Sequence, residues 1–232
     1  MTETVSERRA RLPAAAYDLA MRLGVKPEDQ RDGVRLTQTG QMKTSLGAKS
    51  SWMAFTAAQT ISTRACQFDW RAKLGPFGAI SARDALEHGE GRLDIALLGL
   101  IQIARAKHTP ALVRGELMRY LAELPWAPAA ILLNPNLRWR VDGPDTLAVS
   151  AGEGKTASEV LLSLDSDGRV IGGFAPDRPR SATPPTLPTP WRGRFSDFRQ
   201  HHGLWLPFAG EVAWDIDGKG VVYWQGRIER WE

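Results

Sequence analysis

The sequence contains a single cysteine, Cys66, among its 232 residues. One thiol cannot form an internal disulfide, so the fold does not depend on an oxidising compartment. Long apolar runs are also missing, because the most apolar stretch, residues 93–104, is interrupted by polar side chains and is far shorter than the roughly 20 residues that span a bilayer. The charged residues 1–11 lack the apolar core of a signal peptide. We therefore expect a cytoplasmic protein without stable membrane insertion.

Histidine is scarce as well, with four in the chain, and neither paired histidines nor paired cysteines follow a zinc-binding spacing. The chain has no Gly-x-Ser-x-Gly nucleophile motif. Residues 152–156 end like a phosphate-binding loop, but the first glycine of that motif would fall at Val149 and no helix is expected to follow. From these absences we expect no bound metal and no cofactor.

Positive charge is spread along the chain rather than gathered in blocks. Lysine and arginine number 30 against 26 acidic residues, a net charge of +4, and 23 of the 30 are arginine. A nucleic-acid-binding protein usually concentrates basic residues on one face or in one segment. We therefore expect no nucleic acid partner.

What the sequence does contain is a succession of strand signals. Hydrophobic residues make up 43% and charged residues 24% of the chain, which is typical of a globular protein with a real core. Alternation with a period of two, punctuated by glycine turns such as Asp142-Gly143 and Asp217-Gly218, predicts about twelve strands. The predicted strands are residues 34–39, 55–64, 68–72, 79–86, 93–103, 137–141, 146–151, 157–164, 169–174, 194–200, 204–214 and 221–231.

Helical periodicity is confined to short segments. Apolar residues spaced by about 3.6 predict a central helix over residues 111–124, and residues 13–23 form a second candidate with proline in its first turn. Residues 1–12 are expected to be a flexible arm. The pattern predicts an α+β fold in which a large curved antiparallel sheet, a half-barrel or incomplete barrel of ten to twelve strands, is covered on its concave face by the central helix. Residues 13–232 then form one domain.

A proline-rich loop is predicted at residues 179–190, where five of the fifteen prolines fall within twelve residues. Such a segment is stiff and extended, so it suits either a domain linker or a long crossing loop. We favour the crossing loop, because the strands after it are too few to build a separate core. Next to Trp191, this loop is also a candidate lid.

Tryptophan is unusually frequent, with nine residues. These large rings either fill the core of the curved sheet or line a cavity that grips an apolar or aromatic ligand, and the two roles are compatible. Arginine can stack on an aromatic ring while it pairs with a carboxylate. This combination predicts a ligand-binding site made of Trp70, Arg71, Trp126, Arg178 and Trp191.

Carboxylates near these aromatics provide candidates for acid–base chemistry. Arg119 and Glu123 stand four residues apart on the predicted central helix, a spacing that brings their side chains together. If they face the sheet, Glu123 or Asp84 is a candidate general base or acid and Arg119 a stabiliser of developing negative charge. If they face solvent, they form an ordinary surface pair.

Several motifs resemble a known family. They are Phe68-Asp69-Trp70-Arg71-Ala72, Arg119-Tyr120-Leu121-Ala122-Glu123 with Pro125-Trp126, Thr189-Pro190-Trp191-Arg192-Gly193, Asp197-Phe198-Arg199, and Glu211-Val212-Ala213-Trp214. Together they resemble an uncharacterised bacterial domain-of-unknown-function family from about Leu36 onward. More distantly, the chain resembles outer-membrane lipoprotein carrier proteins, and this resemblance implies a half-barrel closed by helices around an apolar cavity.

Three functions agree with these features. The first is binding of a small apolar or aromatic molecule between sheet and helix. The second is a cofactor-independent enzyme of lyase, isomerase or hydrolase type that acts on such a molecule in the same cavity. The third is a protein-interaction module, which requires an exposed aromatic patch.

Overall fold

One antiparallel sheet dominates the computed structural model, which describes residues 4–43, 45–47, 50–97, 101–106, 108–181 and 186–232. Within these residues thirteen strands form a single sheet in the order β6-β5-β4-β3-β2-β1-β13-β12-β11-β10-β9-β8-β7. The strands are β1 Gly33–Lys43, β2 Trp52–Ser62, β3 Phe68–Leu74, β4 Ile80–Glu87, β5 Glu90–Leu97, β6 Ile101–Arg105, β7 Arg138–Gly143, β8 Thr146–Ala151, β9 Ser158–Leu164, β10 Val170–Pro179, β11 Pro188–His201, β12 Leu204–Ile216 and β13 Lys219–Trp231.

The sheet consists of two meanders joined in the middle. Strands β1 to β6 follow one another in the first arm, and β7 to β13 do so in the second. The first and last strands of the chain, β1 and β13, pair antiparallel from Leu36 opposite Trp231 to Met42 opposite Trp224. These two strands therefore join the two arms into one curved sheet.

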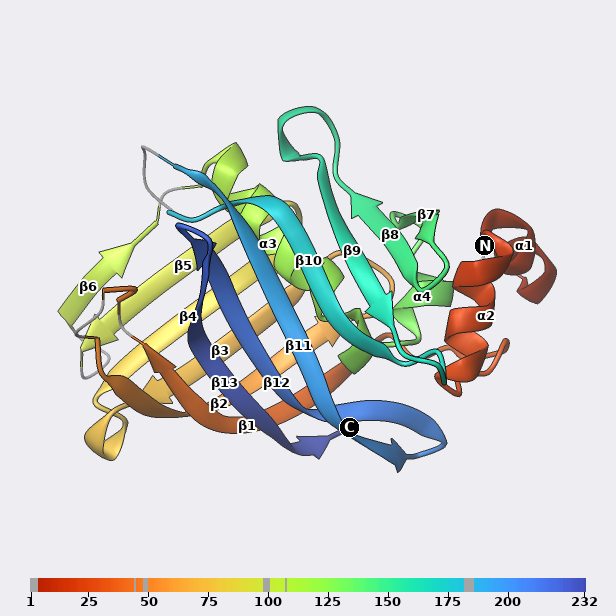
Figure 1. Ribbon diagram of the computed structural model, residues 1–232. Coiled ribbons are helices and arrows are strands. Elements are labelled where there is room, and N and C mark those ends of the chain that lie inside the picture. Colours follow the sequence, from red (N-terminus) through yellow and green to blue (C-terminus); the bar gives the residue numbers. More distant parts are fainter. Residues whose placement is uncertain (1–3, 44, 48–49, 98–100, 107, 182–185) are drawn as a thin grey trace.

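The described residues also form four α-helices: α1 Val5–Arg11, α2 Ala14–Arg22, α3 Pro110–Ala122 and α4 Ala130–Leu133. Figure 1 shows α3 inside the curve of the sheet and α1, α2 and α4 gathered at one end. Helix α3 begins where Thr109 Oγ1 accepts a hydrogen bond from the Leu112 amide, with Pro110 in the first turn. It is buried on nearly every side because it packs against strands of both arms.

The predicted α+β half-barrel is confirmed, with differences in detail. The segment expected as one strand at residues 93–103 overlaps two strands, β5 and β6. Pro207 lies within β12 and pairs with Phe198 in the ladder. Residues 5–11, expected in a flexible arm, form α1, which Thr4 and Glu7 cap reciprocally.

The predicted proline-rich loop is shorter than residues 179–190. Strand β10 continues to Pro179, which pairs with Pro188 at the start of β11, and Arg178 pairs with Thr189. Proline is tolerated there because the pairing is irregular and lies at the ends of the strands. The middle of the predicted lid, residues 182–185, lies outside the described residues.

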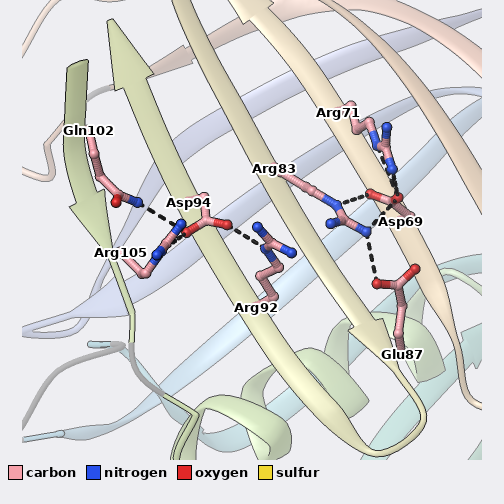
Figure 2. A network of polar contacts seen from close by, with 8 residues as sticks. All are labelled: Asp69, Arg71, Arg83, Glu87, Arg92, Asp94, Gln102 and Arg105. Atoms are coloured by element: carbon pink, nitrogen blue, oxygen red, sulfur yellow. Dashed lines mark hydrogen bonds and ion pairs between the residues drawn. The ribbon is translucent and has the colours of Figure 1, made fainter. Parts of the chain in front are cut away.

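The two faces of the sheet differ as the period of two requires. On β3, Phe68, Trp70, Ala72 and Leu74 are buried, while the residues between them are exposed or half-buried. The outer face of the first arm carries charged side chains that pair with one another (Figure 2): Asp69 with Arg71 and Arg83, Glu87 with Arg83, and Asp94 with Arg92 and Arg105. The neutral Gln102 also donates a hydrogen bond to Asp94. The concave face therefore holds the core, and the outer face is polar and solvated.

Candidate functional site

A cavity of about 160 Å³ lies between the end of α3 and the middle of the sheet. Its lining comes from both arms of the sheet, from α3 and from the short helical turn η2, Leu124–Trp126. The residues that surround it are Gln38, Met42, Gln59, Trp70, Ala82, Asp84, Leu93, Ile95, Arg119, Ala122, Glu123, Trp126, Arg178, Trp191, Gly193, Arg194, Phe195, Gly210, Glu211, Val212, Tyr223 and Trp224.

Tryptophan rings form much of the cavity wall, and three of their N–H groups have partners in the protein. Trp70 Nε1 donates to Gln38 Oε1 at 2.9 Å, Trp126 Nε1 to the Pro207 carbonyl at 3.0 Å, and Trp191 Nε1 to the Tyr223 hydroxyl at 3.1 Å. Because these polar groups are satisfied within the protein, the indoles offer the cavity mainly apolar ring surface.

Glycines in the sheet make room for these rings. A Cβ at Gly210 would lie 3.2 Å from Trp126 Cζ2, and one at Gly226 would lie 2.4 Å from Trp224 Cη2. Gly226 pairs with both Gly40 and Gly210 in the neighbouring strands. This row of glycines lets Trp126 and Trp224 pack directly on the backbone of the sheet.

Arg119 is the central charge of the site. Its Nη1 lies 2.5 Å from Asp84 Oδ2 on β4, and its Nε lies 2.8 Å from Glu123 Oε1 one turn further along the chain. The guanidinium also lies over the rings of Phe68 and Trp70, 4.7 and 5.3 Å from their centroids. Burial lowers the pKa of Arg119, but the neighbouring carboxyl groups outweigh this effect and hold that pKa well above its ordinary value.

A chain of amide hydrogen bonds fixes the other side of Glu123. Gln59 Nε2 donates to Glu123 Oε2, and Gln38 Nε2 donates to Gln59 Oε1 at 3.1 Å. Gln38 in turn accepts a hydrogen bond from Nε1 of Trp70, so the chain of hydrogen bonds ends at an aromatic residue of the cavity wall. Both oxygens of Glu123 are thus engaged, which fits a fixed counter-ion for Arg119.

Two carboxyl groups, those of Glu116 and Asp84, face each other between α3 and β4. Glu116 is 5% exposed, and its Oε2 and Asp84 Oδ1 are buried without a hydrogen-bond partner in the described part of the chain. Burial, above all, and the charge of Asp84 raise the pKa of Glu116 well above its ordinary value. A proton held by Glu116 and shared with Asp84 would give both oxygens a partner.

Arg178 completes the charged part of the wall from the second arm. It is buried, its Nε donates to the Gly115 carbonyl of α3 at 3.2 Å, and its guanidinium lies 4.5 Å from the centroid of Trp191 and 5.5 Å from that of Trp214. Arginine suits this position because its planar guanidinium stacks on aromatic rings while its N–H groups donate hydrogen bonds in the plane of the group.

Among the described residues, no group of three or more histidine, cysteine, aspartate or glutamate side chains has the arrangement of a metal site. The same residues contain no helix that is long and apolar enough to cross a membrane.

Comparison with protein families identifies the group to which this chain belongs. The model of DUF6920, a family of unknown function, matches residues 10–232. The chain belongs to the DUF6920 family. The resemblance indicated by the sequence motifs is thereby confirmed, and the match begins earlier than Leu36. A search of curated proteins found no match.

Solved structures with low sequence identity share the fold of this DUF6920 chain. A DUF1329 family protein from Desulfovibrio piger has a TM-score of 0.52 at 11% identity, covering 94% of this chain and 91% of that one. A LolA superfamily protein from Nitrosomonas europaea has a TM-score of 0.51 at 9% identity, covering 95% and 94%. A putative outer membrane lipoprotein-sorting protein domain from Vibrio parahaemolyticus has a TM-score of 0.52 at 11% identity, covering 94% and 90%.

The DUF6920 fold brings together seven of the eight residues proposed from sequence. All seven line the cavity: Asp84, Arg119 and Glu123 of the proposed catalytic group, and Trp70, Trp126, Arg178 and Trp191 of the proposed binding group. Arg119 and Glu123 therefore face the sheet rather than solvent. Their functional roles stay predictions.

Arg71 does not belong to this site. It stands between the inward-facing Trp70 and Ala72, so the period of the strand turns its side chain to the outer face. There it is exposed and pairs with Asp69 at 2.7 Å (Figure 2). Trp70 lines the cavity and its neighbour Arg71 does not, because adjacent residues of a strand face opposite sides of the sheet.

Sequence reasoning missed Gln38, Gln59, Glu116 and Trp224. A signal existed for the first, because Gln38 continues the inward alternation of Val34 and Leu36 on β1. Gln59 likewise alternates with buried residues of β2, and Glu116 stands one turn before Arg119 on α3. An amide or carboxyl group on an apolar face is informative, because burial requires that it find a partner.

Proposed function

We propose that this protein binds a small apolar or aromatic molecule in the cavity between α3 and the curved sheet. The observation that supports this most strongly is the lining itself, in which tryptophan rings surround a space bordered by a few ordered polar groups. Ligand sites combine apolar walls with a few polar groups that orient the ligand.

The volume limits the size of the ligand. A dry apolar cavity of about 150 Å³ is large enough for benzene. The cavity of about 160 Å³ therefore suits a molecule with one or two small rings, or the end of a longer apolar chain. The Vibrio parahaemolyticus structure with the same fold is named for lipoprotein sorting, which agrees with an apolar ligand class.

Titration with indole and with decanoate, each followed by isothermal calorimetry, tests this proposal. We expect a saturable, near-stoichiometric signal for at least one of the two. Ala82→Phe fills the cavity from β4 and should abolish the signal. Ala58→Phe on β2 is the matched control, because Ala58 is exposed and absent from the lining, and it should bind like the parent.

Two results would overturn the proposal. One is the absence of binding for both probes, together with no small molecule released from freshly purified protein on denaturation and detected by mass spectrometry. The other is equal binding by the two phenylalanine variants, which would place the probe elsewhere.

The carboxyl pair favours a second candidate, carboxylate acid–base catalysis on an apolar molecule in the same cavity. Glu123 is the other candidate for this role, but Arg119 and Gln59 occupy both of its oxygens. Asp84 lines the cavity and shares its environment with the buried Glu116, so this pair is better placed to hold and transfer a proton.

Catalysis and binding give different results in a consumption assay. The parent, Asp84→Asn and Glu123→Gln would each be incubated with a small-molecule extract of the source cells, and retained and consumed compounds measured by mass spectrometry. Consumption by the parent and by Glu123→Gln, but not by Asp84→Asn, would support catalysis by the Asp84 pair. Retention of an unchanged compound by the parent would establish binding alone.

A further inference from the structure

The exposed apolar side chains of this protein gather at one end of the half-barrel. Six of the nine large hydrophobic residues that are exposed in the described part of the chain lie there: Trp52, Phe77, Leu97, Ile101, Ile103 and Leu187. They stand at or beside the turns that join β1 to β2, β3 to β4, β5 to β6 and β10 to β11. We call this group the open rim. Helices α1, α2 and α4 lie at the opposite end (Figure 1).

Phe77 is the most unusual residue of the rim. Its side chain is fully exposed, and its backbone has φ 55°, a left-handed conformation that bulky residues rarely adopt. The turn is held by Pro76 and by two glycines that also have positive φ, Gly75 and Gly78. A fully exposed aromatic ring in a strained turn does not contribute to the hydrophobic core. Its exposure therefore points to contact with another molecule or surface.

An apolar track connects the cavity to this rim. Ile95 lines the cavity, and the next residue of β5 on the same face is Leu97, which is 36% exposed. Leu97 pairs with Ile101 of the edge strand β6, which is 62% exposed. Exposure therefore rises stepwise from the cavity wall to the edge of the sheet, without a charged side chain on the inner face between them.

The charges around the rim are mainly positive. Lys43 ends β1, Lys73 stands next to the end of β3, and Lys219 begins β13, all at this end of the sheet. Among the described residues, none of the three forms an ion pair with a carboxylate. The nearby acidic residues are Asp177 on β10, which pairs with Arg114, Asp215 on β12, which pairs with Arg192, and Asp217 in the turn between β12 and β13. By contrast, the arginines of the outer face in Figure 2 are engaged with Asp69, Glu87 and Asp94.

We propose that the open rim docks this protein on the surface of an anionic phospholipid bilayer. Exposed apolar side chains fringed by lysine are suited to the interface, where the rings and aliphatic groups reach the acyl boundary and the lysines meet the headgroups. Such docking is peripheral and leaves the fold intact. It also brings the apolar track, and with it the cavity, to the bilayer. The surface does not depend on the proposed ligand.

Co-sedimentation with vesicles tests the docking. The full chain would be mixed with vesicles of pure phosphatidylcholine and with vesicles in which roughly 30% of the lipid is the anionic phosphatidylglycerol. We expect at least tenfold stronger partitioning to the anionic vesicles, weakened by added salt. Phe77→Ser with Ile101→Ser should reduce this partitioning about tenfold, and Lys43→Gln, Lys73→Gln and Lys219→Gln together should remove the preference for phosphatidylglycerol.

Val141→Ser is the matched control, because Val141 is 56% exposed on β7, outside the rim. It should partition like the parent. Equal loss for Val141→Ser, unchanged partitioning of the rim variants, or no vesicle binding by the parent would overturn the proposal. A dimer that Ile101→Ser dissociates, seen without vesicle binding, would overturn it as well and assign β6 to a second copy of the chain.

Indole titration of the same variants separates this proposal from the proposed function. The rim residues do not line the cavity, so the Phe77→Ser and Ile101→Ser variant should bind indole like the parent even after it has lost vesicle binding. Loss of indole binding with intact vesicle binding would instead count against the cavity alone.

Discussion

At the scale of single residues, the charge state of Glu116 is set by its surroundings. Burial raises the pKa of this carboxyl group, and the facing Asp84 of β4 raises it further, whereas Arg178 of β10 and Arg119 of α3 act in the opposite direction. The net result is a pKa well above the ordinary value of 4.5. Glu116 therefore carries its proton in a pH range where an exposed glutamate is charged.

This shift predicts a pH-dependent stability. A carboxyl whose pKa is higher in the folded than in the unfolded chain stabilises the fold most below the unfolded pKa, and the contribution is lost as pH rises toward the folded pKa. In the parent, the free energy of unfolding should therefore decline above about pH 4.5 by up to about 1.4 kcal/mol per pH unit from this one group. Urea unfolding between pH 4 and 8 measures the decline.

Glu116→Gln should remove that part of the decline, because its amide stays neutral and can donate to Asp84 at every pH. Glu90→Gln, at an exposed position on β5, is the control and should keep the parent's pH dependence. If Glu116→Gln and the parent show the same slope, Glu116 is not protonated in the folded protein.

The period of two determines which single residues could be assigned from sequence. It places Trp70 inside and Arg71 outside, and applied strictly it also identifies Gln38 and Gln59 as inward-facing. It could not identify their partners, because the bond from Gln59 to Glu123 joins residues 64 positions apart. Chemistry at this site depends on such long-range contacts, which local periodicity does not report.

At the scale of elements, helix α3 links the sheet to the site. It carries Glu116 and Arg119, and Glu123 follows directly at its end. Its boundaries were predictable from apolar spacing, from Pro110 and from Pro125. The burial of α3 on nearly all sides was not predictable. Its sequence has one apolar stripe and one polar stripe, and the polar stripe is buried as well because it faces the cavity and β4.

The cap of α3 predicts a measurable effect. Thr109 Oγ1 accepts from the Leu112 amide at 3.1 Å, and Thr109→Ala leaves that donor without its partner. We expect a loss of about 1 kcal/mol in the free energy of unfolding. Thr109→Ser retains the hydroxyl and should recover most of it. Urea denaturation of both variants measures these losses. Equal losses of unfolding free energy in the two variants would show that the methyl group of Thr109, rather than its capping hydroxyl, stabilises the helix.

At the scale of the whole molecule, the pairing of β1 with β13 determines the architecture. Each meander was predictable, because its strands follow one another with short turns. The joining of the two arms was not, because it pairs residues separated by nearly the whole chain. Nothing in the fold tests the expected cytoplasmic location, which stays a prediction.

Trp231 is the residue through which this junction can be tested. It pairs with Leu36, is 5% exposed, and donates from Nε1 to the Trp126 carbonyl at 2.7 Å. Trp231→Ala removes this packing and leaves the carbonyl unpaired, so we expect a loss of about 3–5 kcal/mol. Trp52→Ala, at an exposed rim position, should cost no more than about 1 kcal/mol.

The form of the unfolding curve distinguishes a shared sheet from two independent arms. If β1 and β13 bind the arms into one cooperative unit, the parent unfolds in a single transition seen alike by circular dichroism and by tryptophan fluorescence. Trp231→Ala should then move the urea midpoint to lower concentration without changing the slope, because the same surface is still exposed in one step. A plateau between two transitions in the parent would contradict this, because each arm would then hold its own strands together without the junction.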